Sequence, residues 1–271
     1  MSAPGAPSFV SSIECSQCGA QHDARRLLTV CERCGAVLLV RYDLERVAKG
    51  GNPEAWASRP FTMYRYRELL PLLPGEEPVT LGEGGTPLLS LPRLGRRLGL
   101  PRLFGKDEGR NPTGTFKARG LSLAVTRARS FGVRGFILPS AGNAGGAAAV
   151  YGARAGLPVA VVVPRETPEA AMTEALLAGA HVFTVDGTLS LAGRVAAGAA
   201  STLGVLDLAT LKEPYRLEGK KTMGFELAEQ LGWRAPDLVL YPTGGGTGLI
   251  GIWKAFQELT ALRWVEGKGP R

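Results

Sequence analysis

Long apolar runs, a secretory signal and low-complexity segments are all missing from this 271-residue sequence. No apolar run reaches the ~20 residues that a membrane-spanning helix needs, so we expect no membrane span. The opening residues, MSAPGAPSFVSSIEC, have neither a basic start nor a continuous apolar stretch, which argues against a secretory signal and for a cytoplasmic protein. A composition of 45% hydrophobic and 21% charged residues is ordinary for a soluble globular chain.

A basic block with interleaved aromatic residues is also missing, although the formal net charge is +8. The positive charge is scattered along the chain in pairs such as Arg25-Arg26 and Lys220-Lys221. We interpret these pairs as parts of a solvated surface, which disfavours nucleic acid as a partner. An anionic substrate or cofactor would fit the same charge.

Cysteine is absent after residue 34, and the four cysteines form two matched pairs, Cys15-x2-Cys18 and Cys31-x2-Cys34. A glycine follows each pair, as in CSQCGA and CERCGA, and this pattern lets backbone N–H groups point at sulfur while four thiolates hold a tetrahedral Zn²⁺. Two disulfides are disfavoured in a cytoplasmic chain, and the match between the pairs argues against a redox centre. A closed Cys₄ site is structural, so we predict a zinc-ribbon, a module that often binds partners or nucleic acid.

Strands, Gly-rich turns and helices alternate along the rest of the chain. This alternation predicts an α/β fold with a mostly parallel sheet and helices on both faces. Ligands of such sheets bind beyond the carboxyl ends of the strands. Three turns between a predicted strand and a predicted helix are therefore expected to line one cleft, namely 111–116, 140–146 and 243–248.

Two of these turns are rich in glycine. The stretch TGGGTG (243–248) follows the predicted strand 237–241, and its backbone N–H groups can converge on an anion at the positive end of the next helix. No Lys-Ser/Thr follows, so it is not a Walker loop. In SAGNAGG (140–146), Asn143 is the one side chain able both to donate and to accept at a ligand. Taken alone, TGGGTG is weak evidence because a tight turn also explains it, and SAGNAGG is better explained as a tight turn.

Lys117 is predicted at the start of a helix, behind Phe116. The helix dipole and partial burial both disfavour the charged ammonium, and an amine with a lowered pKa can form a Schiff base with an aldehyde. An isolated lysine is better explained as a surface charge, and the competing Lys106 lies in a predicted strand without an activating context. Together with the two loops, however, Lys117 indicates an aldehyde cofactor that carries a phosphate, and pyridoxal 5'-phosphate is such a cofactor.

Six stretches carry a resemblance to a known family: GEGGTPLL, NPTGTFKARG, PSAGNAGGAAAVYGARAG, VDGTLSLAGR, LKEPYRLEGKKTMGFELAEQLGW and PTGGGTGLIGIWKAF. The chain resembles the threonine synthases, which are pyridoxal-phosphate enzymes of the tryptophan-synthase-β-like group (fold type II). The four-cysteine segment followed by VLLVRYDL is also similar to the N-terminus of many threonine synthases. The resemblance covers nearly the whole chain in the right order.

The resemblance implies an architecture. It implies fold type II, with three-layer parallel sheets that carry helices on both faces, and a homodimer in which the partner is a second copy of the chain. It implies a zinc-ribbon at 1–45, a larger cofactor-binding domain made of 46–125 and 230–271, and a smaller α/β domain at 126–229. It also implies a further C-terminal part, which would complete the larger domain and contact the pyridine nitrogen.

The resemblance also implies roles for individual residues. Lys117 would bond to the cofactor and act as acid and base, Phe116 would pack beside the cofactor, and Asn143 would bind its 3′-oxygen. The cofactor phosphate would be held by the glycine loop, which comprises Gly244, Gly245, Gly246, Thr247 and Gly248. The substrate carboxylate would be contacted by the loop residues Ser140, Ala141, Gly142 and Ala144.

The implied reaction converts O-phospho-L-homoserine and water into L-threonine and phosphate by γ-elimination and β-addition, so the enzyme would be a lyase of threonine biosynthesis. One residue departs from the family pattern, because threonine synthases commonly carry Asp after the lysine and this chain has Ala118. A pyridoxal-phosphate dependent threonine or serine dehydratase, or another β-replacement enzyme, is therefore an alternative. A non-catalytic homologue that binds a partner or nucleic acid through its zinc-ribbon is the alternative from another class.

Overall fold

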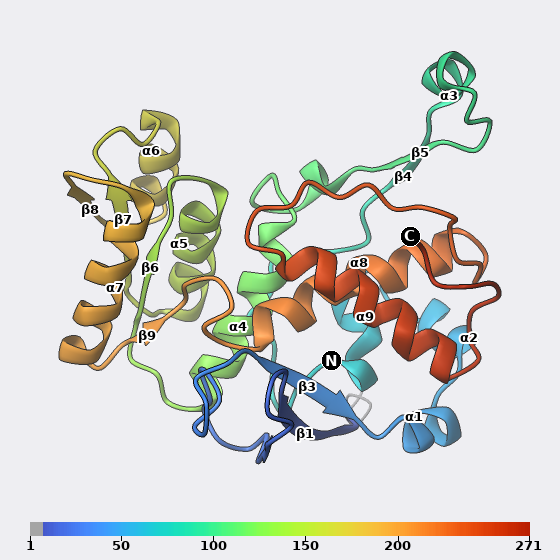
Figure 1. Ribbon diagram of the computed structural model, residues 1–271, viewed down its shortest axis with the longest axis horizontal. Coiled ribbons are helices and arrows are strands. Elements are labelled where there is room, and N and C mark those ends of the chain that lie inside the picture. The colour runs from blue at the N-terminus through green and yellow to red at the C-terminus, as the bar shows by residue number, and fades with distance from the viewer. Residues whose placement is uncertain (1–7) are drawn as a thin grey trace.

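The computed structural model describes residues 8–271 (Figure 1). The N-terminal part contains β1 (Val10–Cys15), β2 (Gln21–His22), β3 (Leu38–Tyr42), α1 (Leu44–Gly50), α2 (Pro53–Ala57) and the 3₁₀ helix η1 (Met63–Leu69). The strands form an antiparallel sheet of order β2-β1-β3. Ile13, Leu38 and Val40 from this sheet are buried, because alternate residues of each strand face the body of the protein.

A parallel sheet of order β8-β7-β6-β9 forms the left-hand lobe of Figure 1. Leu138 and Val161 pack with α5, whereas the alternate residues Ile137 and Val162 pack with α7, so helices cover both faces as predicted. The elements of this lobe are β6 (Phe136–Pro139), α5 (Asn143–Ala155), β7 (Val159–Pro164), α6 (Glu169–Leu177), β8 (His181–Val185), α7 (Leu189–Leu203) and β9 (Leu206–Asp207).

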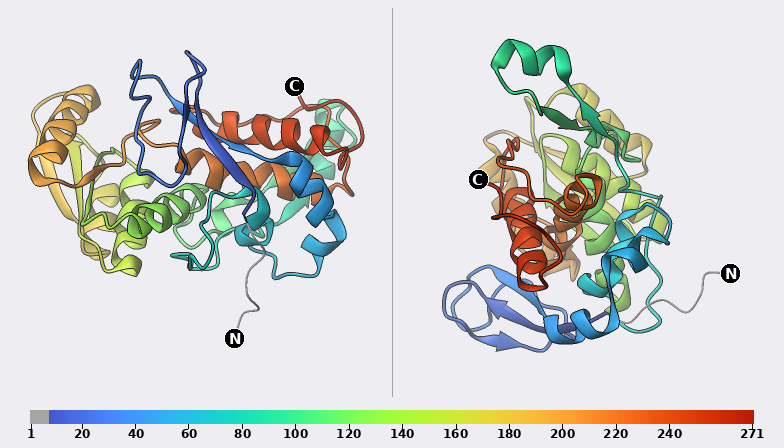
Figure 2. Two further views of the ribbon diagram at one scale, coloured as in Figure 1. Left: turned by 90° about the horizontal axis from the view of Figure 1, so that it is seen from below. Right: turned by 90° about the vertical axis from the view of Figure 1, so that its right-hand side faces the viewer.

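Three long helices form the centre of the molecule: α4 (Lys117–Ser130), α8 (Tyr215–Gln230) and α9 (Thr247–Ala261). Helix α8 packs against both α4 and α9. An apolar cluster that includes Trp56, Tyr66 and Phe225 joins α8 and α9 to the N-terminal part. A projecting hairpin of β4 (Leu88–Ser90), α3 (Pro92–Leu98) and β5 (Phe104–Lys106) leads through η2 (Glu108–Arg110) to α4. The hairpin lies on the side of the molecule opposite to the N-terminal sheet (Figure 2).

The strand predicted at 237–241 is not formed, and this prediction is wrong. In this segment, Asp237 and Val239 form backbone hydrogen bonds to Arg271 alone, and Leu240 remains 85% exposed. A strand needs a ladder of hydrogen bonds to several residues of an adjacent strand, and Arg271 alone cannot provide it. The glycine loop therefore follows an extended segment, not a strand of a sheet.

Within residues 8–271, none of the helices combines the length and the apolar character that crossing a bilayer requires.

Candidate active site and metal site

Helix α4 begins at Lys117, as the sequence predicts. The Thr115 hydroxyl accepts a hydrogen bond from the Lys117 backbone N–H at 3.2 Å, and the Lys117 ammonium lies 3.7 Å from the centre of the Phe116 ring. Burial lowers the pKa of Lys117, and the nearby Arg216 guanidinium lowers it further. The half-buried amine is thus less basic than a surface lysine, which agrees in direction with the sequence prediction.

Lys106, the competing lysine, has a different role. Its ammonium donates hydrogen bonds to Glu226 Oε2 at 2.6 Å, to the Thr86 carbonyl at 2.7 Å and to Gln230 Oε1 at 2.9 Å. All three donor positions of this amine are engaged, so Lys106 connects β5 to α8 and is not free to react.

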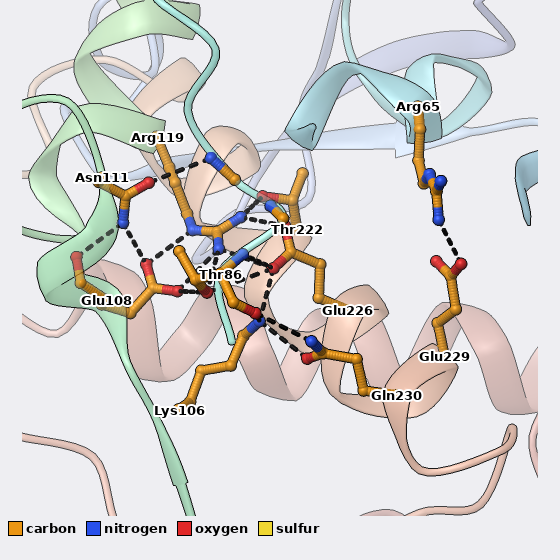
Figure 3. A network of polar contacts seen from close by, with 12 residues as sticks. Arg65, Thr86, Lys106, Glu108, Asn111, Arg119, Thr222, Glu226, Glu229 and Gln230 are labelled. Atoms are coloured by element: carbon orange, nitrogen blue, oxygen red, sulfur yellow. Dashed lines mark hydrogen bonds and ion pairs between the residues drawn. The ribbon is translucent and has the colours of Figure 1, made fainter. Parts of the chain in front are cut away.

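Two residues after Lys117, the Arg119 guanidinium fixes α4 in place. Arg119 is fully buried and forms ion pairs with Glu108 at 2.7 Å and with Glu226 at 2.6 Å. Figure 3 shows this network, in which the Thr86 and Thr222 hydroxyls also accept hydrogen bonds from the guanidinium. Because these contacts join α4 to α8 and to the 81–89 loop, they hold the start of α4, and thus Lys117, in one orientation.

The glycine loop leads directly into α9. Gly246 has a φ of +79°, a conformation that favours glycine, and Thr247 is the buried first residue of the helix. A side chain at Gly248 would overlap the Tyr241 hydroxyl, and one at Gly245 would overlap Thr210. The loop therefore needs glycine at these positions for steric reasons, and its N–H groups lie at the positive end of a fifteen-residue helix.

Lys220 connects the glycine loop to the Lys117 region, and sequence reasoning missed it. The Lys220 ammonium donates to Thr247 Oγ1 at 2.5 Å and lies 5.3 Å from the centre of the Phe116 ring. The ring of Phe116 also packs against Tyr241, with 5.3 Å between the ring centres. Lys117, Phe116 and Thr247 therefore belong to one site.

The interpretation of Lys220-Lys221 as a solvated surface pair is wrong. Lys220 is 4% exposed and Lys221 is fully buried, since α8 lies between α4 and α9. Arg25 and Arg26 are exposed, as expected. The spacing of Arg216 and Lys220, four residues apart on one helix face, was the available signal that these cations act together.

The turn predicted at 140–146 is shorter in the structure: residues 140–142 join β6 to α5, and residues 143–146 already form the first turn of the helix. The Ser140 hydroxyl is buried in this turn: it donates to the Gly142 carbonyl and accepts from the Gly145 N–H, both at 2.9 Å. Asn143 is exposed at the start of α5, and its amide makes no hydrogen bond within residues 8–271. Ala141 and Gly142 lie in this turn and Ala144 lies in the first turn of α5; Ala141 is exposed, and Gly142 and Ala144 are half-buried. No contact in the described part of the chain joins Asn143 to Lys117.

The four cysteines lie together, with Cys15 at the end of β1 and Cys18, Cys31 and Cys34 outside the strands of the N-terminal sheet. Their sulfur atoms are all within 4.8 Å of one another, with 3.4 Å between Cys15 and Cys34 and 3.7 Å between Cys18 and Cys31. A tetrahedral Zn²⁺ with Zn–S bonds of about 2.3 Å separates its sulfur ligands by roughly 3.8 Å, so this arrangement fits the ion. The glycines after the pairs have φ values of +69° at Gly19 and +73° at Gly35, and the backbone N–H of Cys18 donates to Cys15 Sγ.

The side chains around Lys117 suit an anionic cofactor with an aldehyde. Lys117, Arg216 and Lys220 bring three cations to the region. Glu213 is paired with Arg216 and also acts on Lys220, and Asp207 acts on Arg216. One terminal nitrogen of Arg216, Nη2, is buried and has no hydrogen-bond partner within residues 8–271. The donor set and the side-chain-free glycine loop therefore fit the phosphate and aldehyde of pyridoxal phosphate.

Comparison with known proteins agrees with this chemistry. The family described as pyridoxal-phosphate dependent enzyme matches residues 79–268. A threonine synthase of Methanosarcina acetivorans is 36% identical over 251 residues, which are 92% of this chain and 61% of that protein. A threonine synthase of Methanocaldococcus jannaschii is 36% identical over 245 residues, which are 90% of this chain and 60% of the relative.

A solved structure supports the same family. The processed form of threonine deaminase isoform 2 from Solanum lycopersicum has a TM-score of 0.59 and 26% identity, and the match covers 65% of this chain and 51% of that chain. The predicted α/β fold of type II is thereby confirmed. The chain spans about 60% of the length of the curated relatives it matches. Because the family match extends over most of the chain, this protein belongs to the pyridoxal-phosphate dependent enzymes.

Proposed function

We propose that the chain is the catalytic part of a threonine synthase, which converts O-phospho-L-homoserine and water into L-threonine and phosphate. The observation that carries this proposal is the 36% identity to threonine synthases over 92% of the chain, together with Lys117 beside the glycine loop. A threonine or serine dehydratase is the alternative, and substrate assays separate the two.

Pyridoxal phosphate, when bound, supplies an aldehyde for the substrate amine and a ring that takes up negative charge. Lys117 is the group that we assign to covalent attachment and proton transfer. Because its pKa is lowered, more of its amine is neutral near pH 7, and a neutral amine can attack an aldehyde or accept a proton from the α-carbon and later the β-carbon of the substrate.

The remaining assignments are carried over from the family resemblance. The N–H groups of Gly244 to Gly248 and the positive end of α9 would hold the cofactor phosphate. Asn143, whose amide is exposed, would bind the 3′-oxygen, and Phe116 would pack beside the ring. The turn residues Ser140, Ala141, Gly142 and Ala144 would bind the substrate carboxylate with their N–H groups.

The four cysteines are assigned to one structural Zn²⁺. Four mutually close sulfur atoms leave no coordination position for a substrate, so the ion would stabilise the N-terminal sheet. We further propose a cytoplasmic homodimer, with the zinc-ribbon at 1–45, the larger domain at 46–125 and 230–271, and the smaller domain at 126–229.

The test is an absorbance titration of the protein with pyridoxal phosphate, followed by borohydride reduction and peptide mass analysis. We expect a visible band in the parent protein, its loss in Lys117→Ala, and the reduced adduct on the peptide that contains Lys117. An adduct on another lysine, or no band in the parent, would refute the assignment. Phosphate release from O-phospho-L-homoserine, compared with ketoacid formation from serine and threonine, then separates synthase from dehydratase.

A further inference from the structure

Lys220 is a buried cation that the proposed reaction does not use. It projects from α8 to the first residue of α9, where its ammonium donates to the Thr247 hydroxyl at 2.5 Å. The side chain is 4% exposed, so the cost of removing its charge from water is large. Within residues 8–271, Lys220 forms no ion pair that would offset this cost.

Glycines at the crossing of α4 and α8 leave room for the Lys220 side chain to reach the glycine loop. A side chain at Gly120 of α4 would lie 3.2 Å from Lys220 Cε and 3.0 Å from the Arg216 carbonyl. Next to Lys220, a side chain at Gly219 would overlap the backbone of Arg119. The two helices therefore approach closely at this crossing, and the Lys220 side chain passes along α4 to reach Thr247.

The surroundings of Lys220 are strongly positive. Arg216 lies one turn earlier on α8, and Lys117 lies close enough to influence Lys220 electrostatically. Glu213 faces this cluster, but it accepts hydrogen bonds from Arg216 and from the backbone N–H groups at the start of α8. Asp207 of β9 also interacts with Arg216, although burial raises the pKa of this carboxyl and so disfavours its charge. Three cations thus face these two carboxylates, and an excess positive charge remains.

We propose that Lys220 binds a phosphate monoester dianion above the glycine loop, sharing it with Thr247 and the loop N–H groups. This inference rests on the proposed function for the identity of the phosphate, which belongs either to the cofactor or to the substrate and its released product. A dianion supplies the counter-charge that the cluster lacks, and an ammonium strengthens the contact of backbone N–H groups with a phosphate.

The protonation of Lys220 supports this role. Burial lowers its pKa to about 7, and Arg216 and Lys117 contribute to the lowering, whereas Glu213 acts in the opposite direction. A bound dianion favours the ammonium and raises this pKa, so ligand binding above pH 7 takes up a proton. Phosphate affinity should therefore decrease as the pH rises from 7 to 9.

The experiment uses Lys220→Gln, Lys220→Met and a matched control, Lys49→Gln. Lys49 is exposed in the last turn of α1, so the control makes the same charge change outside the site. The Met variant keeps an unbranched side chain of similar length and is expected to fold because it removes an unpaired buried charge. Equilibrium affinities for pyridoxal phosphate and for pyridoxal, which lacks the phosphate, are measured by absorbance.

If the site binds the cofactor phosphate, both Lys220 variants lose about tenfold or more in affinity for pyridoxal phosphate and keep their affinity for pyridoxal, while the control is unchanged. If it binds the phosphate of the substrate, cofactor affinity is retained and the KM for O-phospho-L-homoserine and the inhibition constant of inorganic phosphate rise instead. Equal losses for pyridoxal and pyridoxal phosphate, or no change in any of these constants, would overturn the proposal.

A second measurement keeps the inference separate from the proposed function. Inorganic phosphate is titrated in the absence of cofactor, and the shift in melting temperature is compared between the parent protein and Lys220→Met. A parent that binds no pyridoxal phosphate contradicts the proposed function, but a phosphate-dependent stabilisation that disappears in the variant still supports the phosphate site. The same stabilisation in both proteins, or none in either, contradicts the inference about Lys220.

Discussion

Glu226→Gln is the sharpest test of the network that holds α4 (Figure 3). The Glu226 side chain is fully buried and forms ion pairs with Arg119 and Lys106. The substitution keeps the shape of the side chain but leaves these two cations with Glu108 as their remaining carboxylate. Breaking a buried ion pair in this way costs about 3–5 kcal/mol, which is a large fraction of the stability of an ordinary domain.

The pKa of Glu226 gives an independent magnitude for what its ion pairs contribute to the free energy of unfolding. Burial alone would raise this pKa, but Arg119 and Lys106 outweigh burial and lower it from its usual value of 4.5 to about 2. Such a lowering corresponds to roughly 3 kcal/mol of stability by linkage. Because the folded-state pKa is depressed, this stability is fully present above pH 4.5 and is lost as the pH falls toward 2.

The assay is urea unfolding of the parent and Glu226→Gln at pH 7 and at several lower pH values, with fluorescence and circular dichroism as coincident probes. We expect the variant to be less stable by about 3–5 kcal/mol at pH 7, and the difference to shrink as the pH decreases from 4.5 to 2. Arg165→Gln, which breaks an exposed pair with Asp186, is the control and should have no resolvable effect. A loss below about 1 kcal/mol at pH 7, or a difference that does not depend on pH, would refute the reasoning.

Three further predictions follow from the packing and the metal site. Gly248→Ala should abolish cofactor binding, because its new methyl group overlaps the Tyr241 hydroxyl, whereas Gly198→Ala in α7, which meets no atom within 4 Å and lies outside the glycine loop, should bind normally in the same absorbance titration. Tyr42→Phe removes the 2.7 Å hydrogen bond to buried Glu218 and should cost about 1.5–3 kcal/mol in urea unfolding, and an unchanged midpoint would contradict this. Elemental analysis should find one zinc per chain, and a chelator should lower the melting temperature, while a zinc-free protein of unchanged melting temperature would contradict the metal assignment.

The start of α4 could be predicted from the sequence because it depends on local chemistry. Lys117 follows a Gly-containing turn and begins the helix in the structure, whereas α5 begins at Asn143, within the turn predicted at 140–146. The two cysteine pairs were equally predictable, because their spacing fixes a knuckle and Gly19 supplies the left-handed backbone that closes the first one. Local patterns of this kind need no knowledge of what packs against them.

The buried charges of α8 could not be predicted, because burial here depends on distant segments. The polar stretch LEGKKT is typical of a solvated helix surface. In the structure, however, Glu218 is buried and forms ion pairs with Lys221 and Lys254. Glu218 also accepts a hydrogen bond from the hydroxyl of Tyr42 in the N-terminal sheet. The strand predicted at 237–241 fails for the same reason, since a strand needs an adjacent strand that local sequence does not reveal. Tertiary contacts, not propensity, decide both cases.

The charges of α8 differ in how they are compensated, and the difference explains why one of them is expected to bind a ligand. Glu226 is matched by Arg119 and Lys106, and Glu218 is matched by Lys221 and Lys254. Buried pairs with good geometry balance their own desolvation, so these groups can serve structure alone. The unmatched Lys220 lies at the start of α9, where the helix dipole repels a cation. A cation in such a position lowers stability until an anion binds, so phosphate binding should stabilise the protein through this lysine.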